Sequence, residues 1–269
     1  MLAPRGEAAV PLVMGVLNVT PDSFSDGGRY LDRDAAIEHG LALFDEGADI
    51  VDVGGESTRP GADPVPADVE LQRVVPVIEA LAPRGRVSID TRHADVAEAA
   101  VIAGATLIND VSSQLASVAS ATGAGYVAMH MLGDPRTMQV DPRYDDVVAE
   151  VRQFLVATAD AAAAIGVAEV WIDPGIGFGK TEAHNLELLR HLDALVATGH
   201  PVVVGTSRKR FLSSLLARSD GLPDAQQVPP DDRLEGSIAT AVWSMMQGAR
   251  MVRVHDVRAT VHAAKVVAG

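Results

Sequence analysis

Short polar side chains stand at the ends of several apolar runs in this 269-residue sequence. Asp90, Asn109 and Asp173 each close, or nearly close, such a run. Carboxylates and amides form hydrogen bonds in fixed directions, as the alternating N–H groups and lone pairs of a nitrogen heterocycle require. The residue types therefore predict a pocket for a heterocyclic ligand.

Basic side chains occupy comparable places, although the chain carries a formal net charge of −14. Arg59, Lys209, Arg253 and His255 lie at the ends of apolar runs or in short loops rich in glycine, proline and serine. On an acidic protein, an anionic ligand needs a local group of such residues. We therefore expect them to bind a phosphate or diphosphate group. For Arg59 and Lys209 a solvated surface charge is the alternative.

The elements that must position these residues alternate along the chain. Eight apolar runs have the length and β-branched content of strands, namely residues 10–18, 49–55, 86–91, 105–110, 125–131, 170–175, 201–206 and 250–257. Amphipathic, mostly alanine-rich stretches between them predict helices, among them residues 34–47, 94–105, 144–166 and 184–199. Residues 217–232 are too polar and proline-rich for a helix and are expected to form a surface insertion.

This alternation continues without a break in composition, which predicts the α/β class: a single-domain (β/α)8 TIM barrel over residues 1–269. An open doubly wound sheet is the alternative, but it more often carries GxGxxG after its first strand, and the sequence contains none. The eight runs end in or near Asn18, Glu56, Asp90, Asn109 and Asp110, His130, Asp173, Ser207 to Lys209, and Arg253 to Asp256. Because the carboxyl ends of barrel strands converge on one face, we expect the active site there.

Composition excludes several classes of function. The sequence has no cysteine, which excludes disulfides, thiolate metal sites and cysteine nucleophiles. Its acidic charge and the lack of a basic tract argue against a nucleic-acid partner. No segment resembles a secretion signal or approaches the roughly 18 apolar residues of a membrane span. We therefore expect a cytoplasmic protein without a membrane partner.

The segment DPGIGFGKT (173–181) looks like a phosphate-binding glycine loop but does not match it. The pattern GxxxxGK[ST] needs a glycine where Pro174 stands. The glycines are instead expected to let the backbone approach a flat ligand. Lys180 is left without a role, and His184 is interpreted as a helix-start residue. His130 could be a base or a metal ligand, but no second histidine lies at metal spacing, which favours a packed, hydrogen-bonded side chain.

Nine segments together resemble the dihydropteroate synthase family and follow one another in that family's order. They are MGVLNVTPDSFSDGG (14–28), DVGGESTRPGA (52–62), SIDT (88–91), INDVS (108–112), MHMLGDPRTMQ (129–139), DPGIGFGKT (173–181), TSRKRF (206–211), RLEGS (233–237) and RVHDV (253–257). The resemblance extends from about residue 10 to residue 267. The family has the (β/α)8 barrel fold, in agreement with the pattern of strands and helices.

The resemblance implies an enzyme, a transferase of folate biosynthesis and a sulfonamide target. Its reaction condenses the 7,8-dihydropterin that carries a 6-hydroxymethyl diphosphate with p-aminobenzoate, and dihydropteroate and diphosphate are released. Mg²⁺ is the implied cofactor, and a homodimer is the expected assembly. Because the aromatic amine is a weak nucleophile, catalysis would depend on electrostatic stabilisation of the departing diphosphate.

The resemblance also implies roles for individual residues. The pterin would be held by Asp90, Asn109, Met129, Asp173 and Lys209. The diphosphate would be held by Asn18 with Mg²⁺, by Arg253 and by His255. The p-aminobenzoate site would be shaped by Thr58, Arg59, Pro60, Phe178, Ser207 and Lys209. The residues expected to be catalytic are Lys209, Arg253, Asp90 and Arg59.

The loop PDSFSDGG (21–28) contains one phenylalanine with no apolar neighbour in the sequence. Its paired glycines, Gly27 and Gly28, permit large backbone changes, so the loop is interpreted as a lid. We expect Phe24 to cover bound p-aminobenzoate, with Asp26 ordering the loop near Arg59. Packing of Phe24 on a neighbouring loop is the alternative.

Two other functions are weighed against this one. A folate-dependent methyltransferase acting on a corrinoid would share the barrel and the pterin-binding carboxylates. It would not need the segments 22–28 and 57–61, and it normally serves a cobalamin-binding domain, which this chain lacks. A non-catalytic pterin-binding paralogue would keep the fold without turnover, whereas the loops and basic residues of this sequence look intact.

Overall fold

The computed structural model describes residues 10–20, 29–56, 64–134, 136–223 and 228–269, and in this part of the chain eight parallel strands form one sheet. The strands are β1 (Leu12–Asn18), β2 (Ile50–Gly54), β3 (Arg86–Asp90), β4 (Leu107–Asp110), β5 (Gly125–Met129), β6 (Val170–Asp173), β7 (Val203–Val204) and β8 (Met251–Val254). Each lies within one of the eight apolar runs. Valine, isoleucine and leucine dominate them because parallel strands are covered on both faces.

The sheet curls into a nearly closed barrel. Its strand order is β6-β5-β4-β3-β2-β1-β8-β7, so the first strand lies between the second and the last. At the two ends of this order, β6 meets the segment that leads into β7 through a parallel bridge between Ile172 and Val202. The Ile172 amide also donates to the Pro201 carbonyl at 3.0 Å. The predicted barrel is therefore confirmed, and the open doubly wound sheet is excluded.

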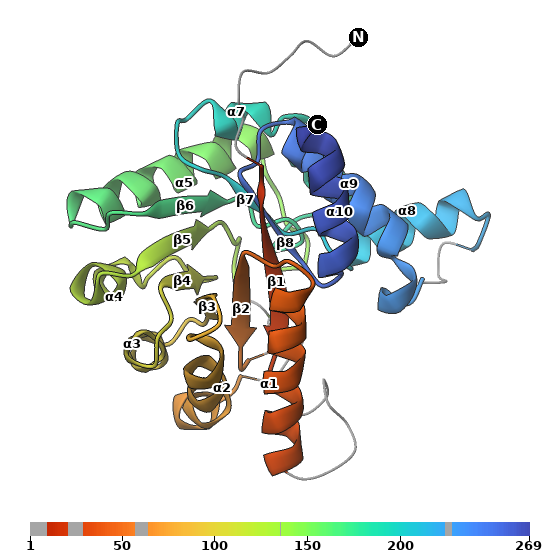
Figure 1. Cartoon of the computed structure of the whole chain (residues 1–269). Coiled ribbons are helices and arrows are strands. Elements are labelled where there is room, and N and C mark those ends of the chain that lie inside the picture. The colour runs from red at the N-terminus through yellow and green to blue at the C-terminus, as the bar shows by residue number, and fades with distance from the viewer. Residues whose placement is uncertain (1–9, 21–28, 57–63, 135, 224–227) are drawn as a thin grey trace.

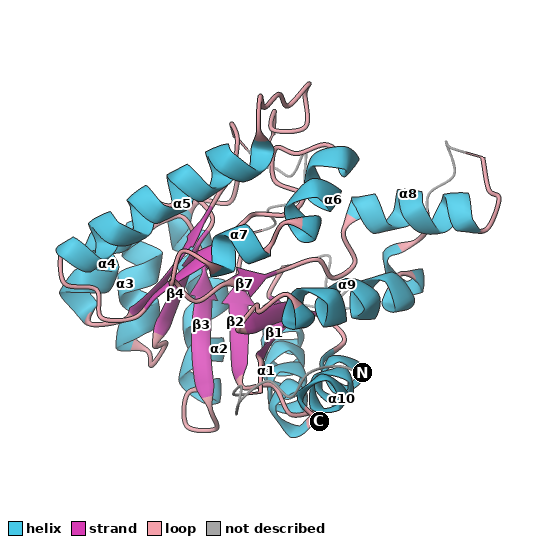
Figure 2. Ribbon diagram, turned by 90° about the horizontal axis from the view of Figure 1, so that it is seen from above, coloured by secondary structure: helices cyan, strands magenta, loops and turns pink. Residues whose placement is uncertain are grey.

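Helices surround the strands, as the two perpendicular views in Figures 1 and 2 show. They are α1 (Arg29–Asp45), α2 (Ala67–Leu81), α3 (Ala94–Ile102), α4 (Ala116–Thr122), α5 (Val147–Ala164), α6 (Glu182–Arg190), α7 (Asp193–Val196), α8 (Arg210–Ser219), α9 (Leu234–Met246) and α10 (Val257–Ala268). None of these described helices is both long and apolar enough to pass through a membrane.

Helix boundaries differ from the sequence-based prediction in two places. The stretch 184–199, predicted as one helix, forms α6 and α7, because the backbone leaves the helical region at His191 (φ −110°, ψ 33°). The stretch 217–232 begins inside α8, which ends at Ser219, and includes one 3-10 turn at Pro230–Asp232. It leads into α9 and reaches β8 only after that helix.

Alternate residues of each strand face two different cores. One buried apolar cluster consists of Met14, Ile50, Leu107, Val127, Trp171, Val203 and Met251. Their sequence neighbours Val51, Ile108 and Val252 pack in a larger cluster with residues of the surrounding helices. Because side chains along a strand alternate between its faces, the first cluster fills the inside of the barrel and the second lies beneath the helices. The position two residues further along each strand again points inward, toward the carboxyl ends.

Candidate active site

A polar layer lies directly above the apolar interior of the barrel. Asp52, Asn109, Asp173 and Arg253 each follow a residue of the interior cluster by two positions, so they point to the same side of their strands. Asp90, the last residue of β3, is paired in register with Asn109. Four of the predicted pterin and diphosphate residues therefore gather in one layer at the carboxyl ends of the strands, together with Asp52, which was not predicted.

Arg253 joins two carboxylates across this layer. Its Nε donates to Asp52 Oδ2 and its Nη2 to Asp90 Oδ2, both at 2.6 Å. Asn109 Nδ2 donates to the same Asp52 oxygen at 2.9 Å. Asp52 is fully buried. Its place two residues after Ile50, inside the apolar run DIVDVGG, is the sequence signal that could have identified it as an inward-facing carboxylate.

The charges in this layer are not balanced. Burial raises the pKa of Asp90 to about 7, since Arg253 opposes the rise only in part and the Asp52 carboxylate adds to it. Burial disfavours the charge of Arg253, but the carboxylates of Asp52 and Asp90 outweigh burial and raise its pKa. In the described part of the chain, Asp52 Oδ1 and Asp90 Oδ1 are buried and have no hydrogen-bond partner. Unpaired buried acceptors are costly, so the layer is suited to a ligand that brings N–H donors.

Asp173 and Lys209 form the opposite side of the layer. Asp173 Oδ1 accepts a hydrogen bond from the Gly175 amide at 2.7 Å, and burial raises the pKa of this carboxyl while Lys209 opposes the rise. Lys209 Nζ donates to the Ile176 carbonyl and lies 4.8 Å from the centre of the Phe178 ring. Burial lowers the pKa of Lys209 to about 8, against the influence of Asp173. The lysine therefore interacts with a buried carboxylate and with an aromatic ring.

The predicted diphosphate residue His255 pairs with Ser207. Ser207 Oγ accepts from the His255 amide at 3.1 Å and lies 3.0 Å from its ring Nδ1. Between Ser207 and Lys209, Arg208 has a left-handed backbone (φ 58°), which is uncommon for a residue with a side chain. The Arg208 guanidinium holds both oxygens of Asp256, at 2.7 and 3.2 Å. This pairing fixes the turn that presents Ser207 and Lys209.

The loop between β6 and α6 is shaped by contacts within the protein. A Cβ added to Gly175 (φ 62°) would lie 1.9 Å from the His130 carbonyl, and one added to Gly179 (φ 64°) would lie 2.4 Å from the Leu132 carbonyl. These two glycines are therefore required by close backbone contacts within the protein, which the sequence-based explanation, approach of a flat ligand, did not include. His184 lies in the first turn of α6, in agreement with its interpretation as a helix-start residue, and forms a reciprocal capping arrangement with Thr181.

His130 is a packed histidine, as predicted. It is 6% exposed, and its ring lies edge-on to Phe154 at 5.1 Å. Its Nδ1 lies 2.9 Å from Lys180 Nζ. Burial, together with Lys180, lowers the pKa of His130 to about 3, so the ring is neutral and accepts at Nδ1.

The remaining predicted residues divide into described and undescribed ones. Met129 is buried two residues after Val127, on the inside of the barrel. Asn18 ends β1 and is half-buried. Asp110, grouped above with the strand-end polar residues, has the opposite orientation to Asn109 and accepts from the amides of Gln114 and Leu115 in the next turn. Phe24, Asp26, Thr58, Arg59 and Pro60 lie outside the described residues.

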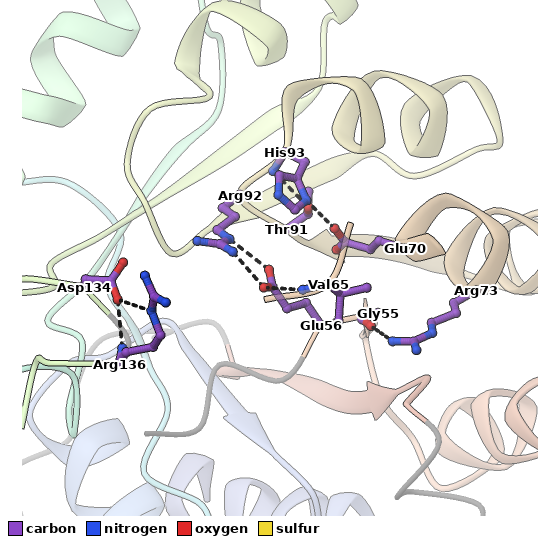
Figure 3. A network of polar contacts seen from close by, with 10 residues as sticks. All are labelled: Gly55, Glu56, Val65, Glu70, Arg73, Thr91, Arg92, His93, Asp134 and Arg136. Carbon is purple, nitrogen blue, oxygen red and sulfur yellow. Dashed lines mark hydrogen bonds and ion pairs between the residues drawn. The ribbon is translucent and has the colours of Figure 1, made fainter. Parts of the chain in front are cut away.

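A second polar network lies beside the carboxyl ends of β2 and β3 (Figure 3). Arg92 Nε and Nη2 donate to the two carboxylate oxygens of Glu56, both at 2.9 Å, and Glu70 Oε2 lies 2.7 Å from His93 Nδ1. Ligand atoms of Glu56, Glu70 and His93 lie within 4.8 Å of one another, as in a metal site. Both Glu56 oxygens and the histidine nitrogen are already engaged, and Arg92 supplies the positive charge, so we interpret the network as a structural brace.

The sequence of this chain resembles those of known enzymes. A family model described as "Pterin binding enzyme" matches residues 14–255. This match covers most of the chain and includes every strand-end residue of the polar layer. The chain belongs to this family of pterin-binding enzymes.

Individual relatives identify the type of enzyme within this family. The dihydropteroate synthase of Mycobacterium leprae (strain TN) is 53% identical over 265 residues, which cover 95% of this chain and 92% of that protein. The solved structure of the Xanthomonas albilineans dihydropteroate synthase with 4-aminobenzoic acid has a TM-score of 0.87 at 47% identity, covering 95% of this chain and 91% of that one. The same bacterium's synthase in complex with 7,8-dihydropteroate has a TM-score of 0.83 at 44% identity, covering 95% and 92%. The chain is thus an enzyme of the dihydropteroate synthase type, a transferase of the folate pathway, as its nine segments predicted.

Proposed function

We propose that the barrel mouth condenses (7,8-dihydropterin-6-yl)methyl diphosphate with p-aminobenzoate to give 7,8-dihydropteroate and diphosphate. The supporting observation is a pair of buried oxygens on Asp52 and Asp90 that have no hydrogen-bond partner among the described residues and lie beside the amide of Asn109. A dihydropterin carries amino and ring N–H donors along one edge, which would satisfy both oxygens. The relatives solved with 4-aminobenzoic acid and with 7,8-dihydropteroate support the same pair of reactants.

In this proposal the two sides of the polar layer hold the pterin. Asp90 and Asn109 would bind one edge, and Asp173 would bind the opposite part of the ring system, with Met129 in the pocket wall. A carboxylate that is buried and short of positive charge gains most from a neutral N–H donor, which fits the raised pKa of Asp90 and of Asp173. Asp52 would bind the pterin edge through its free oxygen.

p-Aminobenzoate would lie toward Phe178, Ser207 and Lys209. Lys209 Nζ is 4.8 Å from the Phe178 ring centre, so a second aromatic ring could share this cationic and aromatic surface. Thr58, Arg59 and Pro60 would complete the site, and Phe24 and Asp26 would cover it. Attack by the amine nitrogen on the pterin methylene forms the new C–N bond and breaks the C–O bond to diphosphate. The amine proton leaves to solvent.

Departure of diphosphate requires positive charge near its oxygens. Arg253 and His255 lie two residues apart at the end of β8 and would supply it, with the Ser207 hydroxyl orienting the His255 ring. A preorganised contact of this kind typically contributes roughly 10²–10³ in rate. A guanidinium already held by two carboxylates loses little freedom when it takes up this role.

Mg²⁺ is proposed to bind with the diphosphate at Asn18. The residue fits the ion chemically, since its amide oxygen is a hard donor at the barrel mouth, and Mg²⁺ usually completes its shell with substrate phosphates and water. When bound, the ion would neutralise part of the negative charge of the leaving group. The protein groups that share this task are Arg253 and His255.

Release of diphosphate from the two substrates and Mg²⁺ tests the proposal. We expect turnover by the wild-type protein, loss of turnover when Mg²⁺ is omitted, and pterin binding weakened roughly 10- to 100-fold in Asp173→Asn, because one charged hydrogen bond contributes about 1.5–3 kcal/mol. Asp193→Asn, an exposed change on α7, is the control and should keep full affinity. Pterin binding without release of diphosphate would instead identify a non-catalytic paralogue.

We also propose a homodimer as the assembly. Trp243 and Met246 lie one turn apart on α9 and are 45% and 39% exposed. Large apolar side chains on one helix face are a common feature of interfaces between subunits. A second copy of the chain would cover them.

A further inference from the structure

The loop between β6 and α6 has an unusual set of hydrogen bonds. Each backbone carbonyl from residue 175 to residue 179 accepts a hydrogen bond from a side chain. The donors, in order, are Lys180 to Gly175 at 3.0 Å, Lys209 to Ile176, Gln139 to Gly177 at 2.6 Å, Lys180 to Phe178 at 3.0 Å and Tyr144 to Gly179 at 2.8 Å. A loop in which consecutive carbonyls are held in this way has little freedom to change its shape.

Lys180 makes the largest share of these contacts. Its ammonium group binds two of the five carbonyls, and it reaches across to the strand end of β5, where it lies 2.9 Å from His130 Nδ1 and 3.3 Å from the His130 carbonyl. The side chain is 2% exposed. A buried lysine is rare unless its protons are all used, and here four acceptors surround three protons. Lys180 is thus enclosed by the loop and cannot contact a substrate in the mouth of the barrel.

The Gly175 and Phe178 carbonyls, which accept from Lys180, belong to the same short segment as the two groups that contact Lys209. Ile176, whose carbonyl accepts from Lys209 Nζ, follows Gly175 directly, and the Phe178 ring lies 4.8 Å from the same nitrogen. The Phe178 amide also donates back to the Gly175 carbonyl at 3.0 Å. A shift of the loop would therefore displace both supports of Lys209 at once.

We propose that Lys180 is a positioning residue for the transfer reaction: it fixes the loop 175–179 so that the Ile176 carbonyl and the Phe178 ring hold Lys209 in place. The inference rests on the proposed function, because it assigns Lys209 to the p-aminobenzoate side of the site. Lys180 acts through the loop and touches no reacting atom.

The electrostatics of the pocket agree with this role. Burial lowers the pKa of Lys180 to about 7, with Asp173 opposing the fall and Lys209 adding to it. The charged form of Lys180 is therefore stabilised by the Asp173 carboxylate and by the backbone carbonyls that accept its hydrogen bonds. Asp173, Lys180 and Lys209 thus form one charge cluster in which a single carboxylate faces two ammonium groups.

The test replaces Lys180 with methionine, which keeps the length of the side chain and removes its donors. We expect Lys180→Met to lower kcat/KM for p-aminobenzoate roughly 100-fold, as displacement of a catalytic group by about 1 Å can do. The Kd for the pterin alone should rise by a smaller factor, at most about tenfold, because the same loop also holds Asp173 through the Gly175 amide. Lys265→Met, the same replacement at an exposed site on α10, is the matched control and should change neither. Lys180→Arg should recover part of the loss, since it restores donors to the carbonyls.

A second measurement does not depend on turnover. In Lys180→Met, amide hydrogen exchange at Gly177 and Phe178 should speed up at least tenfold, while amides in β2 and β3 keep their rates. If the wild-type protein releases no diphosphate, the proposed function is wrong and the exchange experiment still decides whether Lys180 fixes the loop. Unchanged exchange in the loop, or an unchanged kcat/KM in an active enzyme, would overturn the inference. A loss of pterin affinity by the same factor as the loss of kcat/KM would also overturn it.

Discussion

At the scale of single residues, the polar layer of the site depends on the guanidinium of Arg253. One guanidinium serves two carboxylates, Asp52 and Asp90, and each carboxylate keeps one oxygen without a partner among the described residues. A buried pair of acids with one cation between them is less stable than a fully paired cluster, but it is prepared for a ligand that brings N–H donors. The buried carboxylate of Asp90 thus favours ligand binding but lowers the stability of the folded protein.

This conflict predicts a pH-dependent effect of Asp90→Asn on stability. The pKa of Asp90 is raised from 3.8 to about 7 by burial, so the folded protein binds this proton more tightly than the unfolded chain does. Stability is therefore lost as the pH rises from about 4 to about 7, and the asparagine variant avoids that loss.

We expect the melting temperature of Asp90→Asn, relative to wild type, to be higher at pH 8 than at pH 4.5 by roughly 6–12 °C, because the raised pKa corresponds to about 3 kcal/mol over this pH range and 1 kcal/mol shifts the melting temperature of a chain of this size by about 2–4 °C. Calorimetry at the two pH values measures it. A difference between the two proteins that stays constant or falls with pH would refute the raised pKa. Pterin affinity should fall in the same variant.

At the scale of elements, the network in Figure 3 ties three segments together. Glu56, just after β2, accepts from the Val65 amide at 3.1 Å. It also accepts from Nε and Nη2 of Arg92, which follows β3. Arg73, on α2, donates to the Gly55 carbonyl at 2.8 Å. The residues at both ends of the β2–α2 connection are thus fixed to each other and to the next strand. The Glu56 side chain is only 9% exposed and forms its ion pair with Arg92.

Arg92→Ala should therefore destabilise the protein more than removal of an exposed ion pair. A nearly buried carboxylate left without its guanidinium costs about 1–3 kcal/mol. Arg84→Ala, which removes an ion pair to Asp45 with both side chains more than half exposed, should cost less than about 1 kcal/mol. Urea denaturation compares the two free energies of unfolding. Equal losses would show that the Glu56–Arg92 pair is no stronger than a surface pair.

At the scale of the whole molecule, barrel closure assembles the site. Asp52 and Arg253 are 201 positions apart in the sequence, and Asp90 and Arg253 are 163 apart. They meet because β1 pairs with both β2 and β8, so that only one strand separates the last strand from the second. The site is therefore incomplete until the C-terminal strand has joined the sheet.

The proposed homodimer is tested at this scale by light scattering. We expect twice the chain mass of 28.1 kDa for the wild type and the single-chain mass for Met246→Lys, because a charge would be buried in the interface. Ile102→Lys, at an 81% exposed position on α3, serves as the control and should leave the assembly unchanged. A monomeric wild type would exclude the dimer, and a dimeric Met246→Lys would place the interface elsewhere.

Much of this architecture could be read from the sequence. Strand length, β-branched content and the unbroken alternation of strand and helix patterns define a barrel, because these properties depend on local chemistry and periodicity. Asp90, Asn109, Asp173 and Arg253 could be identified for the same reason, since a polar residue at the end of an apolar run is a local signal. The break between α6 and α7 at His191 was missed, as its cause is a backbone conformation that the apolar spacing does not record.

The partners of these residues were decided by the tertiary structure alone. No local sequence pattern indicates that Arg253 pairs with Asp52 and Asp90. Nor does one indicate that Lys180 donates to the carbonyls of its own loop, or that Gly175 lies against the His130 carbonyl. The sequence determined which side chains face the inside of each strand, because that follows from a period of two. Which of them meet depends on the order and stagger of strands around the closed barrel, and these arise only when distant segments pair.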